Sequence, residues 1–201
     1  MNNKDFVNKE YEARVMVSES QYEQILSRYS KSYKPKEYIK NVNVYFDYED
    51  LYLTLHHIVL RTRMIKENEY ELTLKIKGEC SDLELNHILT KDEYESMKKK
   101  VVIPKSPILD KLNELNVNIN RIKLITELKT DRLEVQYKKH LLVIDKNYYG
   151  DMVDYNVEVE SYSKKAAKRY LMQRVSPFGV EYKNGYIPKS RRAINYFKHQ
   201  D

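Results

Sequence analysis

Acidic side chains recur at a spacing of two in two short segments near the ends of this chain. Glu10 and Glu12 alternate with Tyr11 and Ala13, and the pattern returns in Asn156, Glu158 and Glu160. Residues two apart in a β-strand share one face, so each segment predicts a strand with a charged face and an apolar face. Clustered glutamates supply the hard oxygen ligands that Mg²⁺ and Mn²⁺ prefer. The acidic segments therefore predict a site for a divalent metal ion.

Basic side chains show the same spacing in the middle of the chain. Arg61 and Arg63 form one such pair, and Lys75 and Lys77 form a second. Lysine and arginine at alternate positions offer several donors to phosphate oxygens, and arginine can bind them in a bidentate manner. Solvated faces usually interleave the two signs of charge, whereas here the signs are sorted by segment. Together with the acidic segments, this sorting predicts a metal-bound polyphosphate ligand.

The elements that would position these side chains are mostly strands. Apolar and polar residues alternate in eight segments, which predict strands at about 7–17, 42–46, 58–66, 70–77, 83–89, 122–137, 140–146 and 153–160. Helical spacing and capping residues predict helices at about 18–29, 90–100, 106–115, 163–175 and 190–199. The stretch 49–57 is undecided.

Eight mostly consecutive two-faced strands favour a closed antiparallel barrel with surrounding helices, a mainly β fold that is α+β by class. No linker, repeat or low-complexity segment divides the chain, so one domain over residues 1–201 is expected. A charged face lining the lumen would need water, a metal ion and an anion. The alternative is a barrel with an aliphatic interior, whose charged faces would be ordinary solvated surfaces.

Composition narrows the class of protein. The formal net charge of +6 favours anionic partners. The single cysteine excludes an internal disulfide, and no apolar run of membrane-spanning length or signal-peptide core occurs, so a cytoplasmic protein without a membrane partner is expected. The four glycines form neither a Walker loop nor a dinucleotide fingerprint.

Several motifs, taken in order, resemble the CYTH or triphosphate tunnel metalloenzyme family, in particular its bacterial CYTH-domain branch. Glu10-Tyr11-Glu12-Ala13-Arg14 resembles the family's Glu-x-Glu-x-Lys motif, and 154–160 resembles its Asp-Tyr-Glu-x-Glu-x-Glu. The remaining similar segments are Tyr45-Phe46-Asp47, Leu60-Arg61-Thr62-Arg63, Leu74-Lys75-Ile76-Lys77, Thr130-Asp131-Arg132, Asp145 with Tyr148-Tyr149, and Lys189 with Arg192-Ala193.

The resemblance implies an eight-stranded tunnel that binds a triphosphate compound with Mg²⁺ or Mn²⁺. It implies metal ligands at Glu10, Glu12, Asp145, Glu158 and Glu160, and catalytic roles for Glu10, Glu12 and Arg14. It also implies phosphate contacts from Arg61, Arg63, Lys75, Lys77, Arg132, Lys189 and Arg192. Hydrolysis of inorganic triphosphate, or of an organic triphosphate such as thiamine triphosphate, is the expected reaction.

Two residues depart from the family pattern. Arg14 stands where the family has lysine, and Asn156 stands where this branch usually has glutamate. Because arginine stays protonated at any ordinary pH, Arg14 is expected to bind phosphate as a fixed cation and not to act as a general base. Two alternatives stay open, a class IV-type adenylate cyclase and a non-catalytic protein that binds polyphosphate or nucleic acid. Ordered glutamates at both ends favour the enzyme, and the sequence does not indicate an oligomeric state.

Overall fold

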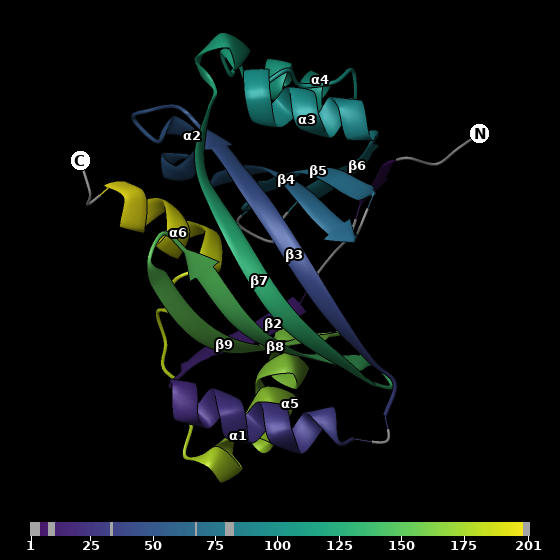
Figure 1. Cartoon of the computed structure of the whole chain (residues 1–201), viewed down its shortest axis with the longest axis vertical. Coiled ribbons are helices and arrows are strands. Elements are labelled where there is room, and N and C mark those ends of the chain that lie inside the picture. The colour runs from purple at the N-terminus through teal and green to yellow at the C-terminus, as the bar shows by residue number, and fades with distance from the viewer. Residues whose placement is uncertain (1–4, 8–10, 33, 67, 79–82, 199–201) are drawn as a thin grey trace. The chain divides into compact units, whose positions relative to one another are not determined.

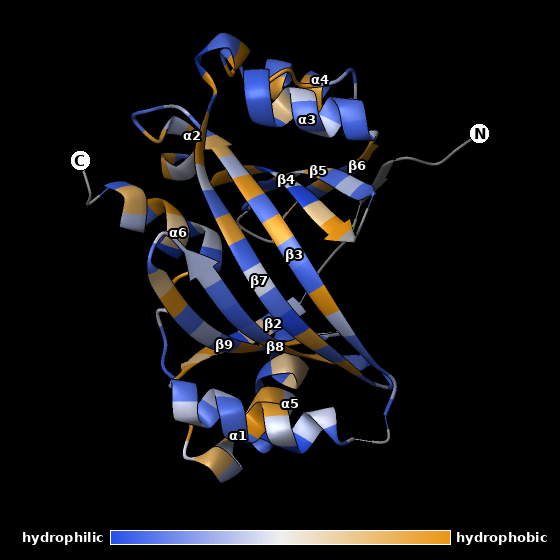
Figure 2. Ribbon diagram, viewed as in Figure 1, coloured by the Kyte–Doolittle hydropathy of each residue, from blue (hydrophilic) through white to orange (hydrophobic). Residues whose placement is uncertain are grey.

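The structure is a computed structural model that describes residues 5–7, 11–32, 34–66, 68–78 and 83–198. The chain divides into two compact units. Unit 1 contains Met1–Lys9, Asn41–Leu128 and Ser190–Asp201, and unit 2 contains Glu10–Lys40 and Lys129–Lys189. Two long strands, β3 (Lys36–Asp47) and β7 (Lys123–Tyr137), have residues in both units. Hydrophilic and hydrophobic residues alternate along both strands (Figure 2).

Unit 2 is a sheet of strands covered by helices on its apolar face. Strand β2 (Tyr11–Val17) pairs with β9 (Met152–Ser161), which pairs with β8 (His140–Tyr149), and β8 pairs with β7. Helices α1 (Glu19–Ser30) and α5 (Lys164–Val175) pack on these strands (Figure 1). The core between them includes Val15, Ile25, Val157, Leu171 and Val175.

Unit 1 repeats this arrangement with other strands. Strand β4 (Ile58–Lys66) pairs with β3 and with β5 (Glu69–Ile76), and β5 pairs with β6 (Leu83–Leu89). The short strand β1 (Asp5–Val7) pairs with β6. Helices α2 (Tyr52–Leu55), α3 (Lys91–Lys100) and α4 (Pro107–Glu114) contact β4, β5 and β6. The remaining elements are α6 (Lys189–Lys198) and the short 3₁₀ helices η1 (Ile119–Arg121) and η2 (Ser176–Phe178).

The strand order is β1-β6-β5-β4-β3-β7-β8-β9-β2, and every pairing described above is antiparallel. The predicted fold class, an antiparallel sheet of the tunnel type with surrounding helices, is confirmed. The order has two ends, β1 and β2, where the sequence predicted a closed ring of eight strands, and β1 is an added ninth strand. The single-domain organisation stays a prediction. No described helix is long and apolar enough to cross a membrane.

Local signals placed most helices correctly. Ser18 caps α1 and Thr90 caps α3, each in a capping box with the residue three positions later, and Ser106 caps α4 with Pro107 in its first turn. Helix α2 fills the stretch that the sequence left undecided. Its backbone is held by Asp47, whose carboxylate accepts hydrogen bonds from the backbone N–H groups of Leu53 at 2.8 Å and Thr54 at 2.9 Å.

Two strands differ from their predicted bounds. Strand β3 begins at Lys36, well before the predicted residue 42. The sequence did not predict this part of the strand because Lys36 to Lys40 lack apolar alternation, and most of them are exposed. Here β3 is next to β7 in the strand order, and the N–H of Gln136 on β7 donates a hydrogen bond to the carbonyl of Pro35 at 2.9 Å. The strand predicted at 7–17 is divided between β1 and β2, and residues 8–10 lie outside the described part of the chain.

Candidate functional site

A cluster of charged and polar side chains occupies the face of unit 2 opposite its helices. Alternation along β2 and β9 places Ala13, Val15, Val157 and Val159 in the core, so their polar neighbours point to the other face. We call this set the unit 2 polar cluster, and its members are Glu12, Arg14, Arg132, Asp145, Asn156, Glu158 and Lys189. Several of them are buried although they lie on the polar face.

Asp145 is the most tightly bound member of the unit 2 polar cluster. Its side chain is fully buried, and Arg132 binds it in a bidentate manner, with Nε 2.8 Å from Oδ1 and Nη2 2.9 Å from Oδ2. Lys189 Nζ lies 2.6 Å from Oδ2. Burial acts to raise the pKa of Asp145, but Arg132 and Lys189 outweigh it and hold that pKa well below its ordinary value. Asp145 therefore stays ionised and orients two cations.

Glu158 is surrounded by cations without being closely bound by any of them. Lys189 Nζ lies 3.7 Å away, and the nearest nitrogens of Arg14 and Arg132 each lie 3.8 Å away. Burial acts to raise the pKa of Glu158, but Lys189 and Arg14 lower it further than burial raises it. The result is a buried, ionised carboxylate whose cationic neighbours lie beyond ordinary hydrogen-bond distance.

Arg14 links the two acidic strands. Its guanidinium forms an ion pair with Glu12 on its own strand, and it lies directly opposite Glu158 in the β2–β9 register. Its Nε is buried and has no hydrogen-bond partner among the described residues. The Tyr186 ring lies over the guanidinium, with 5.5 Å between its centroid and Cζ. Arg14 is thus held in place by acids and an aromatic ring while one donor is left unused.

Asn156 is buried between the carboxylates of Asp145 and Glu158. It lies directly opposite Asp145 in the β8–β9 register, where a glutamate would place a second carboxylate. The amide Nδ2 of Asn156 lies 3.2 Å from Asp145 Oδ2 and 3.3 Å from Glu158 Oε1, and its Oδ1 accepts a hydrogen bond from Asn147 at 2.7 Å. Asn156 therefore donates between two carboxylates.

Unit 1 carries a second set of polar side chains on strands β4, β5 and β6. We call it the unit 1 polar cluster, and its members are Arg61, Arg63, Glu71, Thr73, Lys75, Glu84 and Asn86. Lys75 Nζ lies 3.0 Å from Glu84 Oε2, and Thr73 Oγ1 lies 2.8 Å from Asn86 Oδ1. Burial acts to raise the pKa of Glu84, but Lys75 and Arg61 hold it below its ordinary value. Arg61 Nε is buried without a hydrogen-bond partner among the described residues.

The structure brings most of the predicted residues into one of these two clusters. The first and last acidic segments lie side by side in β2 and β9, where Glu12 is directly opposite Glu160. Glu10 lies outside the described residues. Lys77 is exposed just after β5, and Arg192 is half-buried on α6.

Sequence reasoning missed the polar partners of the predicted residues. Glu84, Thr73, Asn86 and Asn147 form the hydrogen bonds that fix the clusters, yet none was singled out. The available signals were the alternation in 70–77, which places Thr73 on the face of Lys75 and Lys77, and the alternation in 83–89, which places Glu84 and Asn86 on one face. That pattern does not say that Lys75 is the residue opposite Glu84.

The donor set of unit 2 fits a hard divalent cation. Glu12, Glu158 and Glu160 face the same side of two neighbouring strands, and directly opposed carboxylates destabilise a sheet unless a cation lies near them. Arg14 partly fulfils that role for Glu12 in the structure. Within the described ranges, no three acidic, histidine or cysteine side chains are already arranged around one metal position.

Comparison with known proteins identifies relatives that match nearly the whole chain. The CYTH domain matches residues 8–185. "Putative triphosphatase YjbK" of Bacillus subtilis (strain 168) is 29% identical over 191 residues, which cover 92% of this chain and 97% of the relative.

Two solved structures share the fold over nearly their whole length. A Bacillus halodurans protein described as a putative adenylate cyclase has a TM-score of 0.84 at 25% identity, over 92% of this chain and 97% of that one. HpAC1 from Hippeastrum has a TM-score of 0.75 at 19% identity, over 93% of this chain and 95% of its own. HpAC1 is described as a putative adenylyl cyclase with a dominant triphosphatase activity.

Proposed function

The chain belongs to the CYTH family, and we propose that it is a metal-dependent triphosphatase that hydrolyses inorganic triphosphate or an organic triphosphate such as thiamine triphosphate. One observation carries the proposal. Glu12 and Glu160 are directly opposed on neighbouring strands beside the buried, ionised Glu158. Carboxylates so placed favour a bound divalent cation. The description of YjbK as a putative triphosphatase supports the same reaction.

Glu12, Glu158 and Glu160, together with Glu10, would hold Mg²⁺ or Mn²⁺. When bound, such an ion neutralises phosphate charge and lowers the pKa of water. Asp145 was predicted as a further ligand, and its bonds to Arg132 and Lys189 support a positioning role instead. By holding the guanidinium of Arg132 in one plane, Asp145 would present its remaining donors to phosphate oxygens.

The basic side chains would bind the polyphosphate. Arg132 and Lys189 in unit 2 and Arg63 and Lys75 in unit 1 are held by ion pairs or hydrogen bonds, so their donors are ordered before the substrate binds. Arg61 belongs to the same proposed set. Lys77 and Arg192 are proposed to add to this set. Fixed cations stabilise the charge that develops on phosphoryl oxygens in the transition state.

Arg14 would serve as a fixed cation on phosphate. Its Nε is buried without a described partner, so an anion could accept a hydrogen bond there that the free protein does not make. Its guanidinium cannot act as a general base at neutral pH. Proton transfer from water would therefore fall to a glutamate.

Phosphate release from inorganic triphosphate, thiamine triphosphate and ATP, each with Mg²⁺ and with Mn²⁺, tests the proposal. Glu158→Gln and the less buried Glu12→Gln should each lower kcat by about 100-fold or more. Glu95→Gln on α3 is the matched control and should keep full turnover. Equal turnover in all variants, or full activity in chelator, would overturn the assignment.

An adenylate cyclase is the second candidate, and the 25% identity to a protein described as a putative adenylate cyclase favours it. The same assay separates the two activities with ATP as substrate. A cyclase releases pyrophosphate and cyclic AMP, whereas a triphosphatase releases inorganic phosphate. Cyclic AMP as the main product would replace the proposed hydrolysis with cyclisation at the same residues.

A further inference from the structure

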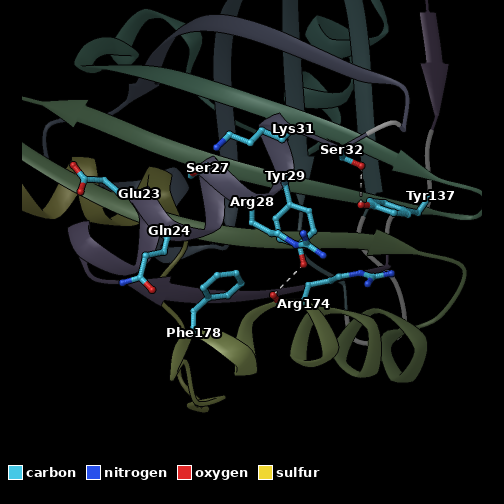
Figure 3. Close-up of a pocket in the computed structure, with 10 residues that line it drawn as sticks. All are labelled: Glu23, Gln24, Ser27, Arg28, Tyr29, Lys31, Ser32, Tyr137, Arg174 and Phe178. Atoms are coloured by element: carbon cyan, nitrogen blue, oxygen red, sulfur yellow. Dashed lines mark hydrogen bonds between the residues drawn. The ribbon is translucent and has the colours of Figure 1, made fainter.

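Unit 2 carries two neighbouring cavities whose described linings contain no member of its polar cluster. The larger, of about 860 Å³, lies between α1, the end of β7 and the segment that follows α5 (Figure 3). The smaller, of about 410 Å³, lies beside the turn from β7 to β8 and the side chains of Tyr162 and Tyr170. Both are lined by Tyr137 and Arg174, so they form one continuous surface, which we call the outer groove.

The outer groove is strongly basic. Its lining includes six cationic side chains, namely Arg28, Lys31, Lys34, Lys138, Lys139 and Arg174. Among the described residues that line it, Glu23 is the one carboxylate. The whole chain has a formal net charge of +6, so this excess is concentrated in the groove well beyond the chain average. A surface of this kind attracts an anion with several charges.

Arg174 lies at the centre of the outer groove and is held by aromatic rings. Its Cζ lies 4.4 Å from the Tyr170 ring centroid and 4.9 Å from that of Tyr137, and its Nη2 donates to the Tyr170 hydroxyl at 2.7 Å. Arg174 Nε is buried and has no hydrogen-bond partner within the described residues. The guanidinium is thus held against two rings in the wall that both cavities share, where its positive charge suits binding of a phosphate group.

Aromatic faces continue along the smaller cavity. The His140 ring stacks on Tyr170 at a centroid distance of 4.2 Å and an interplanar angle of 14°, and the Tyr162 ring lies 5.8 Å from His140. Tyr162 is 58% exposed, so its ring face is accessible to a ligand. An exposed ring beside fixed cations offers a platform on which a planar base can stack.

We propose that the outer groove binds single-stranded nucleic acid, with phosphates on its cations and bases on its tyrosines. The aromatic rings favour this ligand over an inorganic polyphosphate chain, which would use only the charges. Proteins that bind single strands without sequence preference combine a cationic track with stacking rings in this way. The proposal is separate from the triphosphatase proposal and uses none of its residues.

The first test measures binding of a fluorescent oligouridylate of about ten nucleotides, a length within the usual range for one such domain. The strand carries a 5′-hydroxyl, so no triphosphate end is present. The triple variant Lys34→Gln, Lys138→Gln, Lys139→Gln should bind at least about tenfold more weakly. Its plot of log K against log salt concentration should become less steep by about 2, because three phosphate contacts are lost and each contributes about 0.7 to the slope on a single strand.

The matched control removes three exposed lysines from unit 1 by Lys91→Gln, Lys100→Gln, Lys105→Gln. This variant has the same net charge and should bind the oligouridylate like the unaltered protein. Both triple variants should keep phosphate release from triphosphate unchanged, because neither touches the polar clusters. Equal losses of binding in the two triples would show diffuse charge attraction and would overturn the proposal.

Stacking is tested separately with Tyr162→Ala. Loss of one stacked base should weaken binding by roughly 5-fold to 100-fold. The control is Tyr38→Ala, since Tyr38 is similarly exposed, at 63%, but lines neither cavity. An unchanged affinity in Tyr162→Ala would contradict the assignment to this groove.

Discussion

The two polar clusters lie on similar strand faces but differ in their balance of charge. In the unit 2 polar cluster the three carboxylates of Glu12, Asp145 and Glu158 equal the three cations of Arg14, Arg132 and Lys189, and Glu160 adds a fourth carboxylate directly opposite Glu12. In the unit 1 polar cluster the cations outnumber the carboxylates, with Arg61, Arg63 and Lys75 beside Glu71 and Glu84. The proposed function assigns metal ligands to the first face and phosphate contacts to the second.

Burial increases the energetic effect of the charge balance in each cluster. Ionised groups removed from water must be compensated by partners, and an incompletely compensated group favours a ligand of opposite charge. Asp145 is compensated within unit 2 by two cations, whereas Arg14 Nε in unit 2 and Arg61 Nε in unit 1 each lack a hydrogen-bond partner among the described residues.

The largest expected effect is on the stability of unit 2. Asp145→Asn keeps the shape of the side chain but leaves Arg132 and Lys189 without their buried counter-charge. The free energy of unfolding should fall by about 3–5 kcal/mol, as measured by urea denaturation. Asp110→Asn, an exposed position on α4, should change it by less than about 0.5 kcal/mol. A small loss at Asp145 would mean that water compensates both cations.

The second effect is thermal stabilisation by triphosphate with Mg²⁺. A ligand bound only by the folded state at about 100 times its Kd adds about 2.7 kcal/mol. Arg61→Gln should remove much of the resulting shift in Tm, because it deletes a cation from the unit 1 polar cluster. Lys99→Gln on α3 should leave the shift intact. If the two variants lose equal amounts, diffuse attraction accounts for binding.

The third effect is a dependence of stability on pH. The pKa values of Asp145 and Glu158 are lowered in the folded protein from ordinary values of 3.8 and 4.5. The unfolded chain therefore binds more protons as pH falls, so the stability present above pH 4.5 should be lost progressively below it. Each group contributes up to about 1.4 kcal/mol per pH unit. The slope of unfolding free energy between pH 5 and about pH 3 should be shallower in Glu158→Gln; an unchanged slope would show that Glu158 has an ordinary pKa.

The fourth effect concerns turnover at Arg14. Arg14→Lys should retain triphosphate binding and preserve or raise kcat, because a cation stays in place. Arg14→Ala should raise KM about tenfold with a smaller change in kcat. Both variants are to be measured at saturating metal over a range of pH. Near-complete loss of kcat in Arg14→Lys with unchanged affinity would indicate a geometric role for the guanidinium in the transition state.

The smallest effect reverses the usual sign of a site mutation. Glu84→Gln removes the carboxylate that lies 3.0 Å from Lys75 and increases the excess of cations in unit 1. Affinity for triphosphate should rise several-fold, about 1 kcal/mol, in a calorimetric titration. Glu71→Gln removes the other carboxylate of the unit 1 polar cluster, and its affinity for triphosphate is compared with that of Glu84→Gln. Weaker binding in Glu84→Gln would mean that Glu84 is needed to orient Lys75.

The sequence by itself determined the strands, their two faces and most helix ends. Alternation identified the polar face of β2 and β9, and local pairs such as Thr90 with Glu93 and Ser106 with Pro107 marked the helix starts. These signals are local, because a face depends on a period of two and a cap depends on residues three positions apart. The sorting of acids and bases by segment was visible for the same reason.

Only the tertiary structure decided which of these charges meet. The sequence did not predict that Arg132 and Lys189 bind the oxygens of Asp145, whose role as a metal ligand stays a prediction, and Lys75 meets Glu84 because β5 and β6 pair in that register. A period of two fixes the face of a side chain but not its neighbour across the strand, and register sets that neighbour. The balance of charge on each face therefore depends on contacts between segments far apart in the sequence, which no local pattern encodes.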